Sequence, residues 1–427
     1  MKRIVKLSLL VILSTSLMAE DINEEKNSAN RGRSVKDVVG NVLKSKPKEV
    51  DTTSQIGHMF ADGKVSAQAE VLYSGYKIDG SPNIYATAVG GHLMYELAQY
   101  KGFNAAVEFS TAHNINFLSG SNSKQNTTMA SEDESYTELT QSYINYEYEK
   151  LNIRLGRQLI DTPLADSDHV RMIDNTFEAA IFEYKLDEFS FMAGYLSRWQ
   201  GTDTGLDIDK PWQDTGEDGT YFGGVSFSNE LVDISAWYYD ISKAQSSNTA
   251  TGNVANKSSY FDIAIHDYVS QDLYFYLNAQ YLHQSEQDSS GVEARIYGFL
   301  SELVIDENLA FTIAYNKAEK QSSKKSFSGF GGGTLYTNMD TMIIDEITQD
   351  RDAEAIVAGA TYGFGDFGFL YAYGDFDGEL VEQDIGVEYT ANEKLVLAAI
   401  CVLSDNKVAN SGFNDSKNYR IVVAYKF

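Results

Sequence analysis

The sequence is poor in cysteine, proline and positive charge. Its 427 residues include one cysteine and four prolines, and 34 Lys and Arg stand against 61 Asp and Glu, which gives a formal net charge of −27. The single cysteine, Cys401, excludes an internal disulfide, and we interpret it as a small apolar residue within a strand. The excess of acid argues against nucleic-acid binding and favours a surface that gathers cations.

Long apolar runs are also missing beyond the N-terminus. No later stretch holds 18 consecutive apolar residues, so the sequence offers no helix that spans a membrane. The N-terminus itself is typical of a secretory signal. The cations Lys2, Arg3 and Lys6 precede an apolar run from Leu7 to Leu13, and Ala19 offers a small residue for cleavage. We predict a signal peptide over residues 1–19, whose removal changes the net charge from −27 to −30.

A polar leader follows the predicted signal. Residues 20–63 are mostly without a pattern, but the apolar residues within 34–45 have helical spacing. Ser34 is a candidate N-cap, and Pro47 would end such a helix. This segment predicts either a short amphipathic helix or a flexible leader before the first strand, and the sequence leaves both readings open.

Aromatic residues and alternating runs are abundant in the rest of the chain. There are 28 Tyr and 22 Phe. In the run 272–285, Leu273 and Phe275 share one face, while Asn278 and Gln280 share the other. Such alternation predicts strands with an apolar face toward lipid and a polar face toward water. The eighteen runs are 64–77, 84–99, 101–115, 137–149, 151–158, 176–186, 188–197, 219–228, 231–243, 259–269, 272–285, 292–304, 308–319, 353–363, 366–376, 380–390, 394–405 and 417–427.

Short and long connections alternate between these runs. The connections at Tyr100, Lys150 and Asp187 are single residues, whereas 116–136 and 159–175 are long. Outer-membrane barrels have an even number of strands, short periplasmic turns and longer outer loops. The fold class that follows is all-β: a transmembrane antiparallel β-barrel of about 18 strands over 64–427, in the outer membrane of a Gram-negative bacterium, with both termini periplasmic.

The C-terminal run supports closure of such a barrel. Tyr419, Ile421, Val423, Tyr425 and Phe427 fall on one face, and a barrel must pair its last strand with its first to leave no open edge in lipid. A terminal strand that ends in Phe is the form that the bacterial barrel-assembly machinery recognises. We therefore expect that machinery, outer-membrane lipid and lipopolysaccharide as partners, and the sequence leaves a monomer and a homotrimer both open.

The connection 159–175 carries the densest charge near a strand pair. An eighteen-stranded barrel leaves an aqueous channel unless something narrows it, and charges that are costly in lipid suit a water-filled lumen. Pro163 stiffens this segment. We predict that this third loop folds into the lumen.

Arginines on or beside this segment point to the same place. We interpret Arg154, Arg295 and Arg420 as members of the polar faces of their strands. A guanidinium is always charged and can fork onto carboxylates, so the arginines either set a transverse field across the constriction or only pair with acids of the wall. The residues expected to constrict or line the pore are Arg154, Arg157, Asp161, Asp166, Asp168, Arg171, Asp174, Glu178, Arg295 and Arg420.

The stretch RLGRQLIDTPLADSDHVRMIDNTFEA resembles the strand, third loop and strand of OprD-type outer-membrane porins. The matching elements are Gly156-Arg157-Gln158, Asp161-Thr162-Pro163-Leu164, Arg171-Met172 and Asn175-Thr176-Phe177-Glu178. The resemblance implies an eighteen-stranded barrel whose third loop narrows the pore and whose lumen arginines guide small hydrophilic solutes, often carboxylates. It implies that Arg171 and the loop aspartates are constriction residues and that Arg154 belongs to a ladder of arginines. Asp174 departs from the pattern, which has proline before the asparagine, and the leader is longer than in the family.

Other chemistry has little support in the sequence. The six histidines show no metal-ligand spacing and no Gly-x-Ser-x-Gly motif accompanies them, so we expect neither an enzyme nor a cofactor. Asp166 and Asp168 could help to bind calcium or remain solvated. The run FGGGT at 330–334 lacks the lysine of a phosphate loop, and we interpret it as the flexible tip of the longest outer loop, 320–352.

The sequence thus predicts a porin through which small hydrophilic solutes and ions diffuse passively. In this prediction the third loop sets the diameter, the acids favour cations, and the arginines guide anionic groups. The alternative is a surface adhesin or structural barrel with little or no conductance, for which the segment 320–352 would serve.

Overall fold

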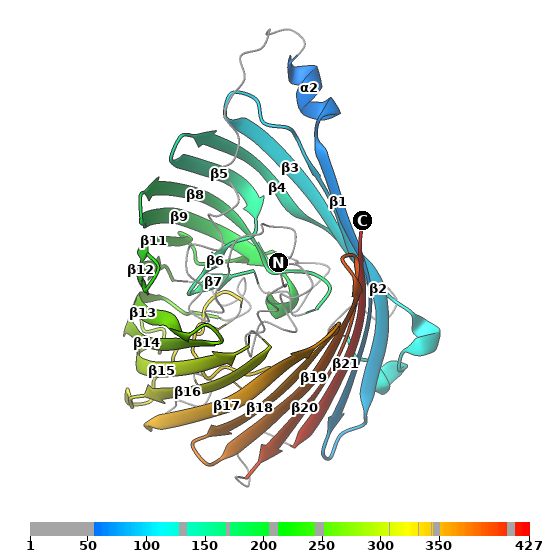
Figure 1. The fold of residues 1–427 in the computed structure, drawn as a ribbon, viewed down its shortest axis with the longest axis vertical. Helices are drawn as coiled ribbons and strands as arrows, with labels where there is room; N and C mark the ends of the chain where they lie inside the picture. The colour runs from blue at the N-terminus through cyan, green and yellow to red at the C-terminus, as the bar shows by residue number, and fades with distance from the viewer. Residues whose placement is uncertain are drawn as a thin grey trace.

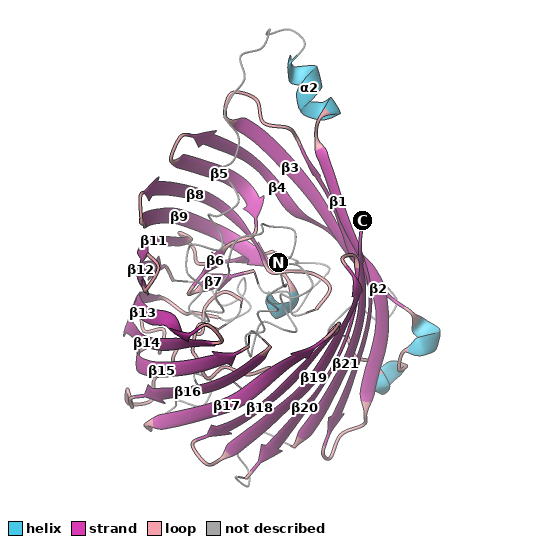
Figure 2. Ribbon diagram, in the orientation of Figure 1, coloured by secondary structure: helices cyan, strands magenta, loops and turns pink. Residues whose placement is uncertain are grey.

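The computed structural model describes residues 55–127, 135–167, 171–204, 212–243, 252–306, 308–331, 333–342, 344, 351–407 and 415–427. The predicted signal peptide 1–19 and the predicted leader helix 34–45 lie outside the described residues, as does Asp168. Helix in the described chain is limited to α2 (Gln55–Ala61) and three single-turn 3-10 segments, and strand dominates (Figure 2). None of these helices is long and apolar enough to cross a membrane.

The strands close into one antiparallel barrel (Figure 1). Nineteen strands share the sheet; β10 (Gln213–Asp214) is a two-residue extension beside β9, and the other eighteen form the wall. The predicted barrel of eighteen strands is confirmed. The wall strands are β1 (Lys64–Ile78), β2 (Ile84–Glu96), β3 (Phe103–Asn114), β4 (Tyr136–Tyr148), β5 (Leu151–Gln158), β8 (Thr176–Leu186), β9 (Phe189–Gln200), β11 (Thr220–Ser228), β12 (Val232–Ile241), β13 (Asn256–Ser270), β14 (Leu273–Glu286), β15 (Ala294–Ile305), β16 (Leu309–Ala318), β17 (Ala353–Phe364), β18 (Phe367–Phe376), β19 (Leu380–Asn392), β20 (Leu395–Asn406) and β21 (Ser416–Lys426).

The last strand closes the ring against the first. β21 pairs with β1 from Gln68, opposite Lys426, to Ile78, opposite Ser416. Beyond the strand, the N–H of Phe427 donates to the carbonyl oxygen of Ala67 at 3.0 Å. This pairing leaves no edge of the sheet open, which lipid would not tolerate.

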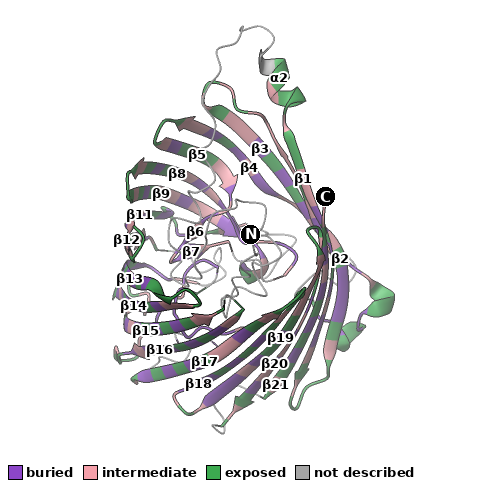
Figure 3. Ribbon diagram, viewed as in Figure 1, coloured by how far each residue is buried: buried purple, intermediate pink, exposed green. Residues whose placement is uncertain are grey.

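Alternate residues of each strand face the two sides of the wall. In β18, Phe369, Tyr371 and Tyr373 are exposed, whereas Leu370 and Ala372 between them are buried. The same banding of exposed and buried residues runs along the other strands (Figure 3). The exposed set forms an apolar outward face, and the buried set faces the lumen, as the period of two requires.

The two ends of the barrel differ in their connections. At one end the turns are tight: Asp187 joins β8 to β9 and Asp306 follows β15, both with positive φ, which Asp tolerates in a turn. Aromatic rings pack on the outward face here, with Phe189 against Phe227 at 5.0 Å between ring centroids. The long connections leave from the opposite end, called here the long-loop end.

Candidate functional site

The third loop, 159–175, enters the barrel with its described residues 159–167 and 171–175. It contains a small hairpin of β6 (Asp161–Thr162) and β7 (Ala165–Asp166). The N–H of Leu164, at the tip of this hairpin, donates to the hydroxyl of Tyr239 at 3.3 Å. Tyr239 is buried on the inward face of β12. The predicted infolding of loop 3 is therefore confirmed.

A second connection also folds inward, which the sequence did not predict. This is the segment 320–352, called here loop 7. Its Phe330 and Tyr336 are fully buried, and Leu335 nearly so. The interpretation of 330–334 as a flexible outer tip is wrong for the described residues of this run, because their neighbours are the inner wall and loop 3. The misreading arose because glycine-rich sequence marks both flexible tips and close backbone contacts.

The backbones of the two loops pair inside the lumen. The N–H of Phe330 donates to the carbonyl oxygen of Leu164 at 2.9 Å, and the N–H of Asp166 donates to the carbonyl oxygen of Phe330 at 3.0 Å. Gly331 next to this contact has φ of +73°, and a Cβ there would lie 2.3 Å from the oxygen of Asp166. Only glycine fits this approach, so Gly331 allows loop 7 to lie against loop 3.

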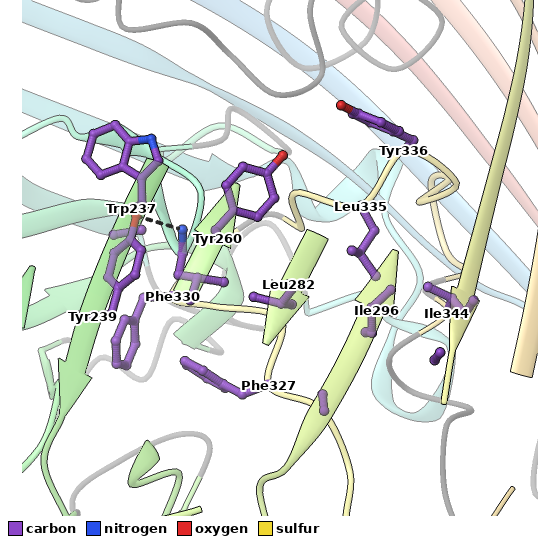
Figure 4. Close-up of a cluster of buried hydrophobic side chains, with 14 of the residues drawn as sticks. Trp237, Tyr239, Tyr260, Leu282, Ile296, Phe327, Phe330, Leu335, Tyr336 and Ile344 are labelled. Atoms are coloured by element: carbon purple, nitrogen blue, oxygen red, sulfur yellow. Dashed lines mark hydrogen bonds between the residues drawn. The ribbon is translucent and has the colours of Figure 1, made fainter. Parts of the chain in front are cut away.

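An apolar cluster fixes both loops to one side of the wall (Figure 4). Tyr239 and Tyr260 extend from the wall, and Phe330 and Phe327 of loop 7 lie beside them. The ring of Phe330 meets the edge of Trp199 with 5.7 Å between centroids. Buried aromatic side chains contribute strongly to packing, so both loops are fixed rather than loosely draped.

Loop 3 continues from this cluster to the opposite wall. Its Met172 and Ile173 pack in a second buried cluster with Leu72 of β1 and Val422 of β21. The guanidinium of neighbouring Arg171 donates from Nη2 to the hydroxyl of Tyr76 on β1 at 3.4 Å. The described parts of loop 3 therefore contact β12 on one side of the lumen and the seam between β21 and β1 on the other.

Loop 7 reaches the same seam through a polar cluster. Arg420, on the inward face of β21, donates to Asp340 of loop 7. Thr341 binds Glu382 of β19 twice, its N–H at 2.9 Å and its hydroxyl at 2.5 Å. Arg171 lies within electrostatic reach of Arg420 and Asp340. We call Arg171, Asp340, Thr341, Glu382 and Arg420 the seam cluster.

The sequence missed three members of the seam cluster. Asp340 and Thr341 lay in a segment interpreted as an outer loop, and Glu382 is one acid among many on inward faces. A signal was present in the glycines before Asp340, because glycine often marks a close approach of two backbones.

Six of the ten predicted pore residues lie in the lumen. Arg154 is inward on β5, with its guanidinium 4.5 Å above the centre of the Tyr143 ring and its Nε 3.5 Å from Asn145. Asp161 and Asp166 face each other across the β6–β7 hairpin. The remaining three are Arg171 and Asp174 of loop 3 and Arg420 of β21, and Asp174 lies within electrostatic reach of Glu108 on the inner wall.

Three predicted pore residues face away from the lumen. Arg157 shares the outward face of β5 with exposed Leu155. It forms an ion pair with Glu178 at 3.7 Å, and Glu178 also binds Arg198 at 2.8 Å. Both guanidiniums lie over the ring of Trp212, at 4.5 and 5.4 Å from its centre. The placement of Arg157 and Glu178 in the pore lining is a wrong prediction.

Arg295 is misplaced in the same way. On β15 it is exposed on the face of Phe299, whereas Ala294 and Ile296 beside it are buried inward. It lies one residue from the start of the strand, at the long-loop end. Beyond the apolar band of a barrel, both faces of a strand meet water or headgroups, so polarity no longer identifies the inward face.

Carboxylates dominate the buried inner wall. Among the described residues, the buried charged side chains of the wall comprise eight acids and a single arginine, Arg420. No three His, Cys, Asp or Glu residues in the described ranges are grouped to hold a metal ion. The eight acids are Glu70, Glu108, Glu183, Asp233, Asp262, Glu302, Glu382 and Asp384.

Some of these acids are held by neighbouring side chains of the wall. Glu108 accepts hydrogen bonds from Thr140 at 2.7 Å and Gln141 at 2.9 Å. Asp233 lies 3.0 Å from His266 Nε2. Hydrogen bonds of this kind hold buried carboxylates in fixed positions, so the inner wall presents a fixed pattern of acidic groups.

Solved structures of OprD-type outer-membrane porins share this fold. OccAB2 of Acinetobacter baumannii superposes with a TM-score of 0.71 at 15% sequence identity, covering 87% of this chain and 99% of that one. OpdK of Pseudomonas aeruginosa, solved with vanillate, gives 0.68 at 14% identity, covering 86% of this chain and 99% of that one. OpdL of the same organism gives 0.67 at 13%, with coverages of 86% and 99%. No protein-family model and no curated protein matches the sequence.

Proposed function

We propose that this chain is an outer-membrane porin through which small hydrophilic solutes and ions diffuse passively. The observation that carries the proposal is the two-sided wall: a closed ring of strands has an apolar outward face and buries acids and amides on its inward face, and the described parts of two loops lie in its lumen. A closed barrel is one of the two structures that satisfy backbone hydrogen bonds in lipid. The similarity of its fold to OprD-type porins supports the same function.

The charge of the lumen supports a preference for cations. Eight acids are buried on the described inner wall against one arginine, and a water-filled passage lined by one sign of charge concentrates the opposite sign. Vanillate, the molecule solved with OpdK, is an anion. In the present chain, the described arginines of the lumen that would favour carboxylates are Arg154, Arg171 and Arg420.

The proposal is tested by single-channel recording in a planar bilayer under a salt gradient. We expect discrete conductance steps and a reversal potential of the sign that cations set. Discrete steps with anion preference would overturn the proposed preference for cations but would still support the proposed porin function. A folded barrel that never conducts would overturn the porin itself.

An adhesin or structural barrel remains the other candidate from the sequence, and the structure weakens its basis. The segment expected to serve it, loop 7, has its described residues 327, 330, 335, 336, 339 and 342 buried in the barrel. A silent barrel in the bilayer would bring this reading forward, because an adhesin need not conduct.

Orientation and assembly are part of the proposal. Long loops of outer-membrane barrels are extracellular, so both termini of this chain would be periplasmic, and residues 1–19 would direct export. The exposed ring of Phe427 meets the edge of Tyr425 at 5.0 Å between centroids. That accessible end supports recognition by the barrel-assembly machinery, and a monomer and a homotrimer both remain compatible with the outward face.

A further inference from the structure

The outward face of the closing seam carries an unusual pair of charges. Lys77 of β1 and Lys417 of β21 are direct cross-strand partners at the long-loop end. Both side chains are exposed, and both fall on the outward face, in phase with Val71 and Tyr419. Like charges directly opposite each other in an antiparallel pair are destabilising.

In the described chain, neither lysine forms an ion pair with a carboxylate. Within the described residues, neither ammonium group lies within 4 Å of a carboxylate oxygen, since neither lysine forms an ion pair. The acids beside the pair are Asp79 and Asp415, at the loop ends of the two strands, and the exposed Asp405 on the neighbouring β20. Asp415 is engaged elsewhere, because its Oδ1 accepts from the N–H of Asn406 at 2.8 Å and its carbonyl oxygen accepts from the N–H of Asp79 at 3.0 Å.

Other outward lysines at the same end of the barrel do have partners. Lys257 lies 3.8 Å from Asp240, and Lys317 lies 2.6 Å from Glu354. The seam lysines therefore differ from lysines in an equivalent setting on the same surface. Unlike those lysines, Lys77 and Lys417 have no carboxylate partner among the described residues to neutralise their charge.

The height of the pair on the wall indicates what supplies the missing negative charge. One pairing step below it on the outward face lie Gly75 and the exposed ring of Tyr419, and then exposed Ile421. Tyrosine and lysine at the end of an apolar band mark the level of lipid headgroups. A ligand at this position would contact two ammonium groups and the apolar surface directly below them. The ligand that matches both is one with a negatively charged head and a hydrocarbon tail.

We propose that Lys77 and Lys417 together bind a phosphate group of an outer-leaflet lipid at the closing seam. Phosphate suits the site because it offers several acceptor oxygens and lysine binds it as a point charge. The inference rests on the proposed function for the orientation of the long-loop end. Its consequence is that lipid neutralises the strand pair that closes the ring.

The test uses the full-length protein in detergent, with diphosphoryl lipid A as the probe and native mass spectrometry to count bound lipid and determine Kd. We compare K77Q/K417Q with K257Q/K317Q, which removes two outward lysines that have carboxylate partners. We expect K77Q/K417Q to weaken binding about tenfold or more, since each lysine at a lipid surface contributes measurably, and K257Q/K317Q to stay within about twofold of the unmodified protein. Equal affinity of the unmodified protein and K77Q/K417Q would overturn the proposal.

Two further arms identify the source of the phosphate and the role of charge. For lipid A that lacks phosphates, the Kd of the unmodified protein and the Kd of K77Q/K417Q should be equal, because the two lysines then have no phosphate to bind. Inorganic phosphate that abolishes lipid binding at comparable concentration would show a free-anion site and overturn the lipid assignment. K77R/K417R should restore affinity. Unchanged single-channel conductance of K77Q/K417Q would show that this variant folds. A protein that binds lipid but never conducts would refute the proposed porin function and leave the lipid-binding proposal intact.

Discussion

The inward and outward faces of the same strands lead to opposite electrostatic outcomes. On β5, Arg154 faces the lumen beside Tyr143, and three positions later Arg157 faces outward and shares Glu178 with Arg198. The inner wall buries many acids with few cations, whereas the outward rim pairs its charges or leaves lysines facing the headgroup level. The side of the wall, rather than the residue type, decides what an arginine does here.

The largest expected effect comes from removing the buried cation of the inner face. Arg420→Gln leaves Asp340 without its partner in the seam cluster, and breaking one side of a buried ion pair costs about 3–5 kcal/mol of stability. We expect a lower thermal unfolding midpoint in detergent and a reversal potential shifted further toward cations.

The matched change on the outward face is Arg295→Gln. Because Arg295 is exposed and outward, we expect its unfolding midpoint and reversal potential to match those of the unmodified protein. Equal effects of the two substitutions would show that the faces do not differ as described.

The next effect concerns the contact between the two lumen loops. Gly331→Val adds a Cβ 2.3 Å from the carbonyl oxygen of Asp166, at a φ of +73°. We expect the loops to separate and single-channel conductance to rise about twofold or more, because an eighteen-stranded barrel without narrowing segments is an open channel. Gly378→Val is the control, since its φ is +68° but nothing lies within 4 Å of its Cβ. A rise in both variants would point to strain and not to loop contact.

A smaller effect separates two arginines of one strand. Arg154→Gln removes a lumen cation and should move the reversal potential a few millivolts toward cations, with conductance changed little. Arg157→Gln removes a partly exposed ion pair worth about 0–1 kcal/mol and should leave both electrical properties unchanged. A selectivity shift in Arg157→Gln alone would reverse the assignment of the two faces.

The smallest effect lies at the outer end of loop 7. Lys324 binds Glu293 at 2.5 Å and Glu286 at 2.7 Å, and these hydrogen bonds raise the pKa of its ammonium group above the ordinary value of 10.5. A raised lysine pKa gives stability that is complete below the unfolded value and is lost as pH rises through the folded value. The thermal midpoint should therefore fall between pH 9 and pH 12 slightly more in the unmodified protein than in Lys324→Gln. The same fall in both would exclude a contribution from these bonds.

Most of the fold could be predicted because the wall obeys one simple rule. The runs 151–158 and 176–186 coincide with β5 and β8, and the other predicted runs overlap their strands with ends that differ by a few residues. Period-two alternation against a short turn such as Asp187 is local information, so the sequence carries it directly. Infolding of loop 3 followed from its charge and from the resemblance around Arg171.

The site was predicted less well for two physical reasons. Alternation identifies faces only where lipid imposes it, so Arg295, near a strand end, was assigned to the wrong side. Arg157 was included because it flanks loop 3, and Glu178 as an acid opposed to the arginines, although strict alternation along β5 and β8 places both outward. Loop 7 was missed because its place depends on contacts with residues far away in sequence, such as Leu164 and Arg420.

The pairing of Phe330 with Leu164 has a consequence for the order of folding. These residues lie 166 positions apart, and the second attachment of loop 7 uses Arg420 on the last strand. Contacts of such long range pay their loop-closure entropy before they contribute any stability. The narrowing of the lumen therefore comes after the strands have joined into a ring. A ring that closes in the wrong register cannot place Arg420 beside Asp340, so the narrow channel forms only in a correctly closed barrel.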